Sequence, residues 1–355
     1  EVRVRTEAVQ ILPEAKMAVL KDLATGDIYN ESYDNLILSP GARPVKPNIE
    51  GVEADGVFTL RNIPDTLKIK EFINQRKPRD GVVVGGGYIG LEIAENLKHA
   101  GMNVTVVELS EHLIPSFDYD MAAGIHRYIK AQGINLCLNN GLKAIKEGRV
   151  ILQNGELKAD MVILSAGVRP DTQFLRGAVP LNERGGIITD SHMRTDIPNI
   201  YAVGDAAEIR NFVSGRPALI PLAGPANRRI AADNIAGIPL EYKGSQGSAV
   251  LKLFDMTAAA TGLNEREAAQ SGLDYDKTYI YSAPHASYYP GGRNMSIKAL
   301  WDKKTYKLLG AQLVGFDGVD KRSDVLAAAI RLGAKITDLA GLELCYAPPF
   351  GSAKD

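Results

Sequence analysis

A segment of this chain occurs twice, and the repeat limits the folds that the chain can adopt. Residues 34–44 have the sequence DNLILSPGARP, and residues 160–170 have the sequence DMVILSAGVRP. Each copy is an apolar strand that ends at a glycine and follows a predicted hairpin. A repeat of this length indicates two structural units of one kind. The 355 residues leave room for two or three domains.

A glycine-rich turn begins the unit that the second copy closes. A predicted strand, residues 82–84, runs into Gly85, Gly87 and Gly90, which open a predicted helix. The first glycine permits a tight turn, the second lets a pyrophosphate approach the backbone, and the third lets helix and strand pack closely. The N-terminus of the helix faces the phosphates with its positive dipole end. The alternative is a glycine-rich turn without a ligand.

Glu108 ends the next strand, at the spacing expected of a ribose-binding acid. A carboxylate there accepts hydrogen bonds from the ribose 2′-hydroxyl and repels a 2′-phosphate. The sequence therefore predicts an NAD-type site that favours NADH over NADPH. The first copy of the repeat should close a similar unit, whose glycine turn would lie before Glu1. We therefore expect a nucleotide-binding segment upstream and a sequence that is a fragment.

A second motif, residues 195–205, ends in Gly204 and Asp205. A predicted strand here carries an acid at its carboxyl edge, where cofactors bind in open α/β sheets. A carboxylate at that edge can hold a polyol hydroxyl; the alternative is an ordinary turn aspartate. Beyond residue 245 the pattern indicates a separate α+β domain. Its predicted strands are 250–254, 295–301 and 308–315, and its predicted helices are 264–271 and Asp324–Leu332.

Charge and composition exclude several classes of protein. The 41 basic and 42 acidic residues are mixed along the chain, without the basic block of a nucleic-acid-binding surface. No apolar run approaches the roughly 18–20 residues of a membrane span. The two cysteines cannot build a disulfide framework and favour a cytoplasmic protein. The five histidines lack the spacing of metal ligands, so no metal site is expected.

These motifs together resemble the two-dinucleotide flavoprotein disulfide reductases. The string that ends in Asp205 is similar to the one that binds FAD through its aspartate in that family, and the repeated Ser-x-Gly strands are similar to its paired segments. Residues 345–355, CYAPPFGSAKD, resemble the tail of coenzyme A-disulfide reductases, and residues 285–291 point to the same branch. In that branch a rhodanese domain follows, which here would begin after Asp355. The similarity covers essentially the whole chain.

The resemblance implies an α/β protein with two Rossmann-like, three-layer domains and a C-terminal α+β dimerisation domain. The expected boundaries are 1–50 with 170–243 for the rest of the FAD-binding domain, 51–169 for the NAD(H)-binding domain and 244–355 for the dimerisation domain. It implies a homodimer that uses FAD and NADH. The implied NAD(H) contacts are Gly85, Gly87, Tyr88, Ile89, Gly90, Glu92, Glu108 and Gly167. The implied FAD contacts are Pro40, Gly41, Tyr201, Gly204, Asp205, Leu222 and Ala223.

Two tyrosines carry the expected sulfur chemistry. By resemblance, Tyr288 and Tyr346 reach the partner subunit's site, where they flank the reactive sulfur and donate a proton to the leaving thiolate. Tyrosine suits this role because its reference pKa, about 10, leaves it neutral at neutral pH. Taken alone, both residues fit packed interface aromatics better than catalytic groups, and only the surrounding strings favour the catalytic role. Asn227 and Lys354 occupy positions where the family contacts coenzyme A.

Two features depart from the family pattern. Neither cysteine matches the reactive cysteine of the family: Cys137 fits a buried strand residue, and Cys345 lies outside the nucleophile motif. The string that begins at Asn227 is about two residues shorter than usual, either by a real change or by residues absent from the sequence. The resemblance nevertheless implies an FAD-dependent, NADH-using reductase of coenzyme A disulfide, persulfide or polysulfide. Its reactive cysteine would lie upstream of Glu1. The alternatives are an NADH oxidase or peroxidase of the same family, and a catalytically inactive NADH-binding dimeric fragment.

Overall fold

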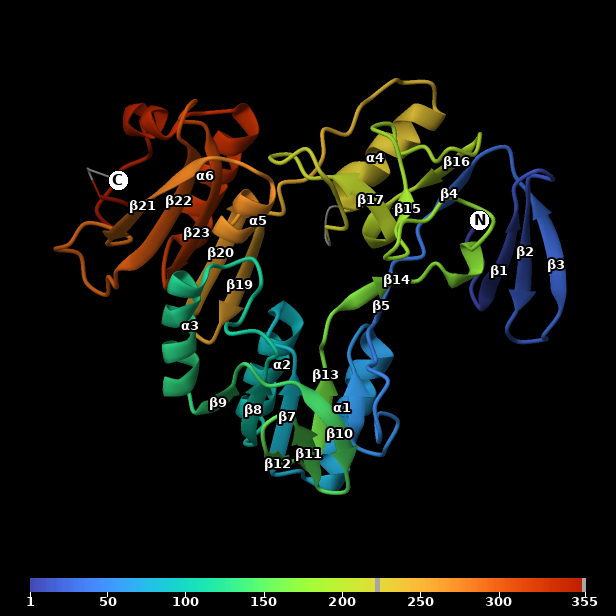
Figure 1. Ribbon diagram of the computed structural model, residues 1–355, viewed down its shortest axis with the longest axis horizontal. Coiled ribbons are helices and arrows are strands. Elements are labelled where there is room, and N and C mark those ends of the chain that lie inside the picture. Colours follow the sequence, from blue (N-terminus) through green and yellow to red (C-terminus); the bar gives the residue numbers. More distant parts are fainter. Residues whose placement is uncertain (221–223, 353–355) are drawn as a thin grey trace. The chain divides into compact units, whose positions relative to one another are not determined.

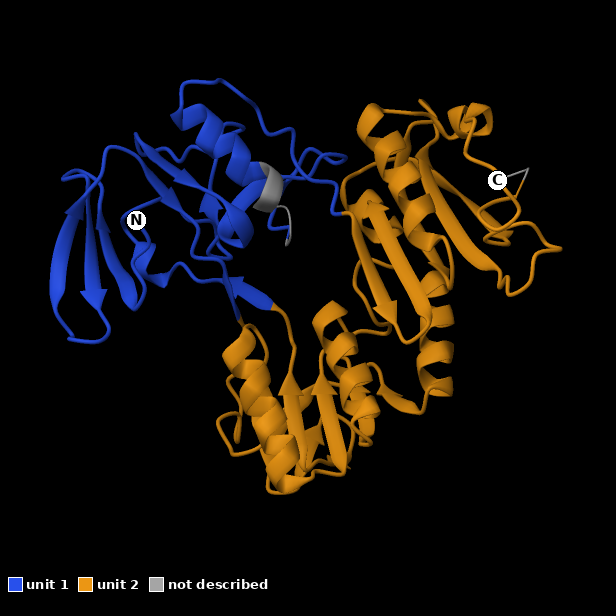
Figure 2. Cartoon of the chain, turned by 180° about the vertical axis from the view of Figure 1, so that it is seen from behind, with its two compact units in different colours: residues 1–43, 168–247 blue, residues 44–167, 248–355 orange. Residues whose placement is uncertain are grey.

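The structure is a computed structural model that describes residues 1–220 and 224–352, with the backbone alone for residues 224–226. The predicted α/β fold class is found: helices accompany both parallel and antiparallel sheets (Figure 1). The chain divides into two compact units, coloured separately in Figure 2. No helix among the described residues is long and apolar enough to cross a membrane.

Unit 1 comprises residues 1–43 and 168–247. Its core gathers small and branched apolar side chains, among them Ile187, Ile200 and Ala231. Its elements are an antiparallel sheet of β1 (Thr6–Leu12), β2 (Met17–Asp22) and β3 (Ile28–Ser32); a parallel pair of β4 (Leu36–Leu38) and β16 (Ile200–Ala202); a sheet of β15 (Ile187–Ile188), β17 (Ala207–Arg210) and β18 (Pro217–Ala218); and helix α4 (Gly224–Ile235). A hairpin turn around Gly26, which has a φ of 85°, joins β2 to β3.

Unit 2 comprises residues 44–167 and 248–355. Its first part contains a parallel sheet in the order β6 (Val57–Thr59), β13 (Met161–Leu164), β7 (Asp80–Val84), β8 (Asn103–Val107) and β9 (Ile134–Cys137). The sheet lies between α1 (Ile63–Arg76), α2 (Tyr88–His99) and α3 (Tyr119–Ala131) on one face and an antiparallel sheet of β10 (Leu142–Lys146), β11 (Arg149–Leu152) and β12 (Glu156–Lys158) on the other.

The three layers follow from the alternation of side chains along the central strands. Val83 packs with Leu91 and Ile125 on the helical face. Its neighbours Val82 and Val84 point to the opposite face and pack with the antiparallel sheet. Because both faces are covered, these strands are mostly apolar, as is usual for parallel sheets.

The second part of unit 2 is a five-stranded antiparallel sheet. Its order is β19 (Ala249–Leu253), β20 (Met256–Gly262), β23 (Leu308–Gly315), β22 (Met295–Asp302) and β21 (Tyr275–Ser282), with helices α5 (Glu265–Gln270) and α6 (Val319–Leu332). One face packs against α6 through Leu313 and Leu326. The other face shares the large core of the first part through Leu251 and Val314.

One helix begins earlier than the sequence predicts. We expected it to begin at Asp324, but α6 begins at Val319. Its N-cap is Gly318 in the left-handed region, with φ of 67°, and no side chain caps the helix. The usual start signal, a Ser, Thr, Asp or Asn before the apolar pattern, is therefore missing.

The two copies of the repeat adopt corresponding structures. Each copy contains a parallel strand, β4 in unit 1 and β13 in unit 2. The ends of the copies form β5 (Ala42–Pro44) and β14 (Val168–Pro170), which pair with each other. The repeat therefore marks two of the three positions where the chain passes from one unit to the other; the third lies at residues 247–248.

Candidate functional site

The glycine-rich turn lies between β7 and α2, as the sequence predicts. Gly85 has a φ of 110°, and a Cβ atom there would lie 2.3 Å from the carbonyl oxygen of Ser165. A Cβ atom at Gly90 would lie 2.0 Å from the carbonyl oxygen of Gly85. Both residues must be glycine because backbone atoms already fill the space that a side chain would need.

Gly87 is different, because its surroundings are open. It is the N-cap of α2 with a φ of −80°, and no described atom lies within 4 Å of its Cβ position. No side chain caps the helix. The first N–H groups of a helix have no partner inside it, so an uncapped, open helix N-terminus can bind an anion such as a pyrophosphate.

Glu108 is tied to the same turn. One carboxylate oxygen accepts a hydrogen bond from the Gly86 N–H at 2.7 Å, and the other accepts one from the Ser110 N–H at 2.8 Å. The side chain is half-exposed. A carboxylate oxygen accepts more than one hydrogen bond, so Glu108 can still accept from a ribose hydroxyl beside the turn.

The other predicted NAD(H) contacts lie around this turn. The Tyr88 hydroxyl is 2.9 Å from Ser116 Oγ, and burial raises the pKa of Tyr88. Ile89 and Glu92, on the first turns of α2, are both exposed. Gly167, with φ of 97°, follows β13. These residues come together at the carboxyl edge of the parallel sheet, where such sheets bind ligands.

The predicted FAD contacts of unit 1 also share an edge. β4 and β16 are parallel, and Leu38 pairs in register with Ala202. Pro40 and Gly41 follow one strand, and Gly204 and Asp205 follow the other. Both pairs therefore lie at the same carboxyl edge, as the predicted cofactor contacts require. Tyr201, within β16, is 7% exposed and belongs to the core.

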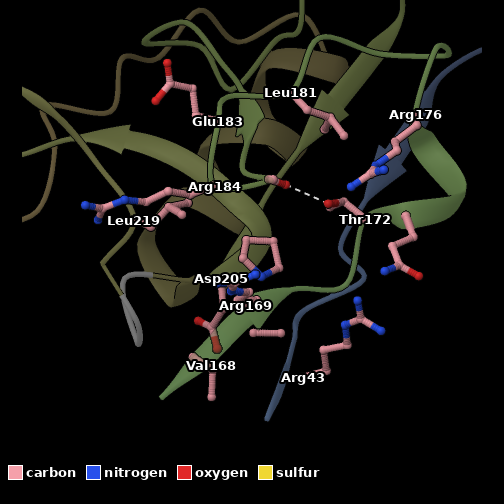
Figure 3. Close-up of a pocket in the computed structure, with 14 residues that line it drawn as sticks. Arg43, Val168, Arg169, Thr172, Arg176, Leu181, Glu183, Arg184, Asp205 and Leu219 are labelled. Carbon is pink, nitrogen blue, oxygen red and sulfur yellow. Dashed lines mark hydrogen bonds between the residues drawn. The ribbon is translucent and has the colours of Figure 1, made fainter. Parts of the chain in front are cut away.

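Asp205 lines a cavity of about 510 Å³ in unit 1 (Figure 3). Arg43, Arg169, Arg176 and Arg184 line it too, and the Thr172 hydroxyl, which donates to the Gly185 carbonyl at 2.6 Å, forms part of the wall. The Asp205 carboxylate can accept a hydrogen bond from a sugar-alcohol hydroxyl, and the guanidinium groups can bind phosphates. The cavity therefore suits an elongated phosphorylated cofactor. No motif marks Arg176, Arg184 or Thr172, so the sequence does not predict them; Arg43 and Arg169 occupy matching positions of the repeat, but the repeat alone assigns them no role.

Asn227, the first described side chain of α4, is fully buried. Its Oδ1 accepts a hydrogen bond from the Gly204 N–H at 3.3 Å, and its Nδ2 has no partner among the described residues. A buried donor without a partner is costly, so a ligand or another group should accept it. The coenzyme A contact predicted for Asn227 stays a prediction. The predicted contacts Leu222, Ala223 and Lys354 lie outside the described residues.

Tyr288 and Tyr346, 58 positions apart in the sequence (346 − 288), lie together in the structure. Their hydroxyls interact, and the interaction with Tyr346 raises the pKa of Tyr288. The segments are joined by a hydrogen bond from the Ala286 N–H to the Pro348 carbonyl at 3.2 Å. Both rings are exposed, at 73% and 53%. A neutral phenol pair on the surface can donate a proton to a bound sulfur anion.

Both cysteines are free thiols, as expected. Cys137 ends β9 and is half-buried, where a buried residue was expected; its Sγ accepts a hydrogen bond from Asn140 Nδ2 at 3.2 Å. Cys345 is exposed beside Tyr346. Neither residue lies at the glycine turn or lines the cavity in unit 1.

Three acids form a cluster that could suit a metal ion. Asp118, Asp120 and Glu265 bring carboxylate oxygens within 4.8 Å of one another. The ammonium group of Lys298 contacts all three, so a protein cation already takes the central position. Among the described residues, this cluster is therefore an ion-pair network around Lys298 and not a metal centre.

Comparison with known families identifies the class of protein. The profile described as pyridine nucleotide-disulphide oxidoreductase matches residues 1–226, and the profile of the dimerisation domain of that family matches residues 248–355. The chain belongs to the pyridine nucleotide-disulphide oxidoreductases. It is therefore an oxidoreductase of a family that uses FAD and NAD(P)H, and the predicted fold class and cofactors are confirmed at that level.

Particular relatives are similar over nearly the whole chain. A coenzyme A disulfide reductase of Staphylococcus epidermidis is 36% identical over 98% of this chain and 80% of its own length. The solved structure of reduced Bacillus anthracis CoADR-RHD is 44% identical, with a TM-score of 0.97, over 100% of this chain. A NAD-dependent persulfide reductase of A. fulgidus is 35% identical, with a TM-score of 0.95, over 99% of this chain. The chain spans 65% and 66% of those two solved chains.

Proposed function

We propose that this chain is part of an FAD-dependent enzyme that uses NADH to reduce coenzyme A disulfide, persulfide or polysulfide. The observation that carries the proposal is the open glycine turn at Gly87 with Glu108 bound to it, in a chain that also pairs Tyr288 with Tyr346. The relatives that are coenzyme A disulfide and persulfide reductases support the choice of substrate.

The glycine turn would hold and orient NADH. The uncapped N-terminus of α2 would bind the pyrophosphate, since its backbone N–H groups face open space at Gly87. Glu108 would accept hydrogen bonds from the adenosine ribose and disfavour the 2′-phosphate of NADPH. Glu92 would line the nicotinamide pocket.

Asp205 and the arginines of the unit 1 cavity would hold FAD. Asp205 would bind the ribityl hydroxyls, and Arg43 and Arg169 would lie within reach of the phosphates. When bound, FAD supplies two-electron chemistry between a nicotinamide and a sulfur centre. The buried Nδ2 of Asn227, beside Gly204, supplies a further donor for a bound group.

The tyrosine pair would serve the sulfur substrate. Tyr288 and Tyr346 would flank the reactive sulfur of the partner subunit and donate a proton as the thiolate leaves. The reactive thiol itself would be a cysteine other than Cys137 and Cys345, upstream of Glu1, because neither of these two residues lines the cavity proposed for FAD. Attack of that thiolate on a disulfide sulfur would form a mixed disulfide and release the first thiol; two electrons that come from NADH would then free the second thiol and restore the reactive thiolate.

The experiment is NADH consumption by the full-length, FAD-loaded protein with coenzyme A disulfide, coenzyme A persulfide and hydrogen peroxide in parallel. We expect turnover with one or both sulfur substrates, and at least about tenfold lower kcat/KM with peroxide, a difference of about 1.4 kcal/mol. Turnover with peroxide alone would favour an NADH oxidase or peroxidase. A protein that binds NADH but retains no flavin would favour an inactive binding fragment.

A further inference from the structure

The connector between β8 and α3, residues 109–118, is held in a strained conformation. Ile114 has a φ of 56°, a region that a β-branched residue rarely adopts, and it is fully buried. Such a conformation persists only where the surroundings determine it, and it is common beside functional sites. Here the Ile114 N–H donates to the carbonyl of Gly86, inside the glycine turn, at 2.9 Å.

Further contacts join the connector to the turn that we propose binds NADH. A Cβ atom at Gly86 would lie 2.3 Å from a methyl group of Leu113, so the connector packs directly on the turn. Ser116 forms the hydrogen bond to the Tyr88 hydroxyl. The connector therefore determines where the backbone of the turn and the first residue of α2 lie.

The other side of the connector packs against the five-stranded sheet of unit 2 and against the start of α5. The carbonyl of Pro115 accepts hydrogen bonds from Asn264 Nδ2 at 3.0 Å and from Arg266 at 3.2 Å. Asp118 exchanges two hydrogen bonds with the side chain of Gln312, at 2.7 and 2.6 Å. The Glu265 N–H also donates to Asp118, at 3.0 Å.

Lys298 lies at the centre of this docking. Its side chain is 0% exposed, and its ammonium group contacts Asp118 at 2.8 Å, Asp120 at 3.0 Å, and Glu265. An ammonium group has three N–H donors, and here each meets a carboxylate. Burial alone would lower the pKa of Lys298, but the three carboxylates outweigh it and raise the pKa above its usual value.

We propose that Lys298 is a positioning residue for nicotinamide-nucleotide binding, which fixes the connector through Asp118 and so holds the glycine turn in its binding conformation. The proposal rests on the proposed function of that turn. Without the ammonium group, three carboxylates would face one another in a half-buried place, and like charges at such distances repel strongly. The connector would move away from the sheet, and the strained backbone at Ile114 would relax.

The test compares variants of the chain by NADH titration, with fluorescence as the signal, and by thermal unfolding. Lys298→Met should raise the Kd for NADH about tenfold or more, the size expected when one to two hydrogen bonds to a bound phosphate are lost. Asn264→Ser keeps a good N-cap for α5 but loses the donor to Pro115. It should raise the Kd about threefold, with little loss of stability.

Lys277→Met is the matched control. Lys277 also pairs with Glu265, at 2.8 Å, but its side chain is 38% exposed and contacts no residue of the connector by hydrogen bond or ion pair among the described residues. It should bind NADH within about twofold of the wild type, since exposed pairs contribute little. Variants of Lys298 and Asn264 that melt earlier but bind NADH as the wild type does would overturn the proposal.

Hydrogen exchange separates this proposal from the proposed function, because it needs no nucleotide. Lys298→Met, or Asn264→Ser if the first variant does not fold, should speed exchange of the Ile114 amide. The amide of Val150, buried in β11, should keep its rate. Faster exchange at Ile114 in a chain that binds no NADH would contradict the proposed function alone. Equal rates at Ile114 in wild type and variant would contradict the positioning role.

Discussion

Two glycines of one turn are glycine for opposite reasons. At Gly90 a methyl group would collide with the Gly85 carbonyl, so the reason is packing inside the protein. At Gly87 a methyl group would meet no described atom, and φ is ordinary for any residue, so the protein itself has no need of glycine there. The remaining reason is a group from outside the chain, which points to a ligand at that position.

Gly87→Ala should therefore separate binding from stability. The variant should fold with an unfolding midpoint like that of the wild type, because the new methyl group enters open space. It should bind NADH at least about tenfold more weakly, roughly 1.4 kcal/mol, because the methyl group occupies the approach of the pyrophosphate. Gly124→Ala, in α3 and also without neighbours, is the control and should leave NADH binding unchanged. If Gly87→Ala and the wild type bind NADH with equal affinity, the pyrophosphate does not bind at this turn.

Glu108 should decide between the two nicotinamide nucleotides. Glu108→Gln keeps an oxygen for the Gly86 N–H but removes the charge that repels a 2′-phosphate. The ratio of kcat/KM for NADH over NADPH should fall about tenfold or more, roughly 1.4 kcal/mol. Glu111→Gln, an exposed acid three positions further along the chain (111 − 108), controls for general charge. A ratio that falls equally in both variants would mean that Glu108 does not contact the ribose.

At the scale of elements, α3 supports the connector through a buried histidine. His126 Nε2 accepts a hydrogen bond from the Leu113 N–H at 3.1 Å, so this nitrogen carries no proton and the imidazole ring is neutral. Burial, together with the nearby His112 and Lys130, lowers the pKa of His126 from 6.5 to about 4. A depressed histidine pKa in the folded state means that the unfolded chain takes up the proton first as the pH falls.

Stability should therefore be complete above the unfolded pKa of about 6.5 and should fall as the pH drops towards about 4. His126→Gln, whose amide oxygen can accept the same hydrogen bond, should be less stable at neutral pH but should lose less of its stability on acidification. The measurement is urea unfolding of both proteins at neutral pH and at about pH 5, between the two pKa values. Parallel losses in the two proteins would show that carboxylates, and not His126, cause the acid sensitivity.

The elements with local signals were predictable, and those with distant partners were not. The turn at Gly85, the helix start after Gly87 and the strand that ends before Glu108 each carry a pattern of neighbouring residues. The aromatic strand β21 was not predicted, because six of its eight residues are exposed and it shows no alternation. Lys298 was also missed, since its three acids come from positions 118, 120 and 265, and only folding brings them to it.

At the scale of the whole molecule, the antiparallel sheet of unit 2 exposes an apolar edge. β21 is an edge strand, and its Ile280 and Tyr281 are 51% and 70% exposed. Phe350, in the C-terminal segment, is 70% exposed. Large exposed apolar side chains on an unpaired edge strand are suited to a protein interface. Because this part matches the dimerisation domain of the family, we expect a second copy of the chain to cover it.

Ile280→Glu should convert that dimer into monomers, because a charge buried in an apolar interface without a partner costs several kcal/mol. Sedimentation velocity should show half the mass of the wild type. The monomer should still bind NADH, since the glycine turn lies wholly within one chain. It should lose reduction of the sulfur substrate, because Tyr288 and Tyr346 would no longer reach the partner's reactive sulfur. Ile28→Glu, at a more exposed isoleucine (66%) in the edge strand β3 of unit 1, should stay dimeric and active. A monomeric Ile280→Glu protein with full sulfur reductase activity would show that each subunit reduces its substrate without its partner's tyrosines.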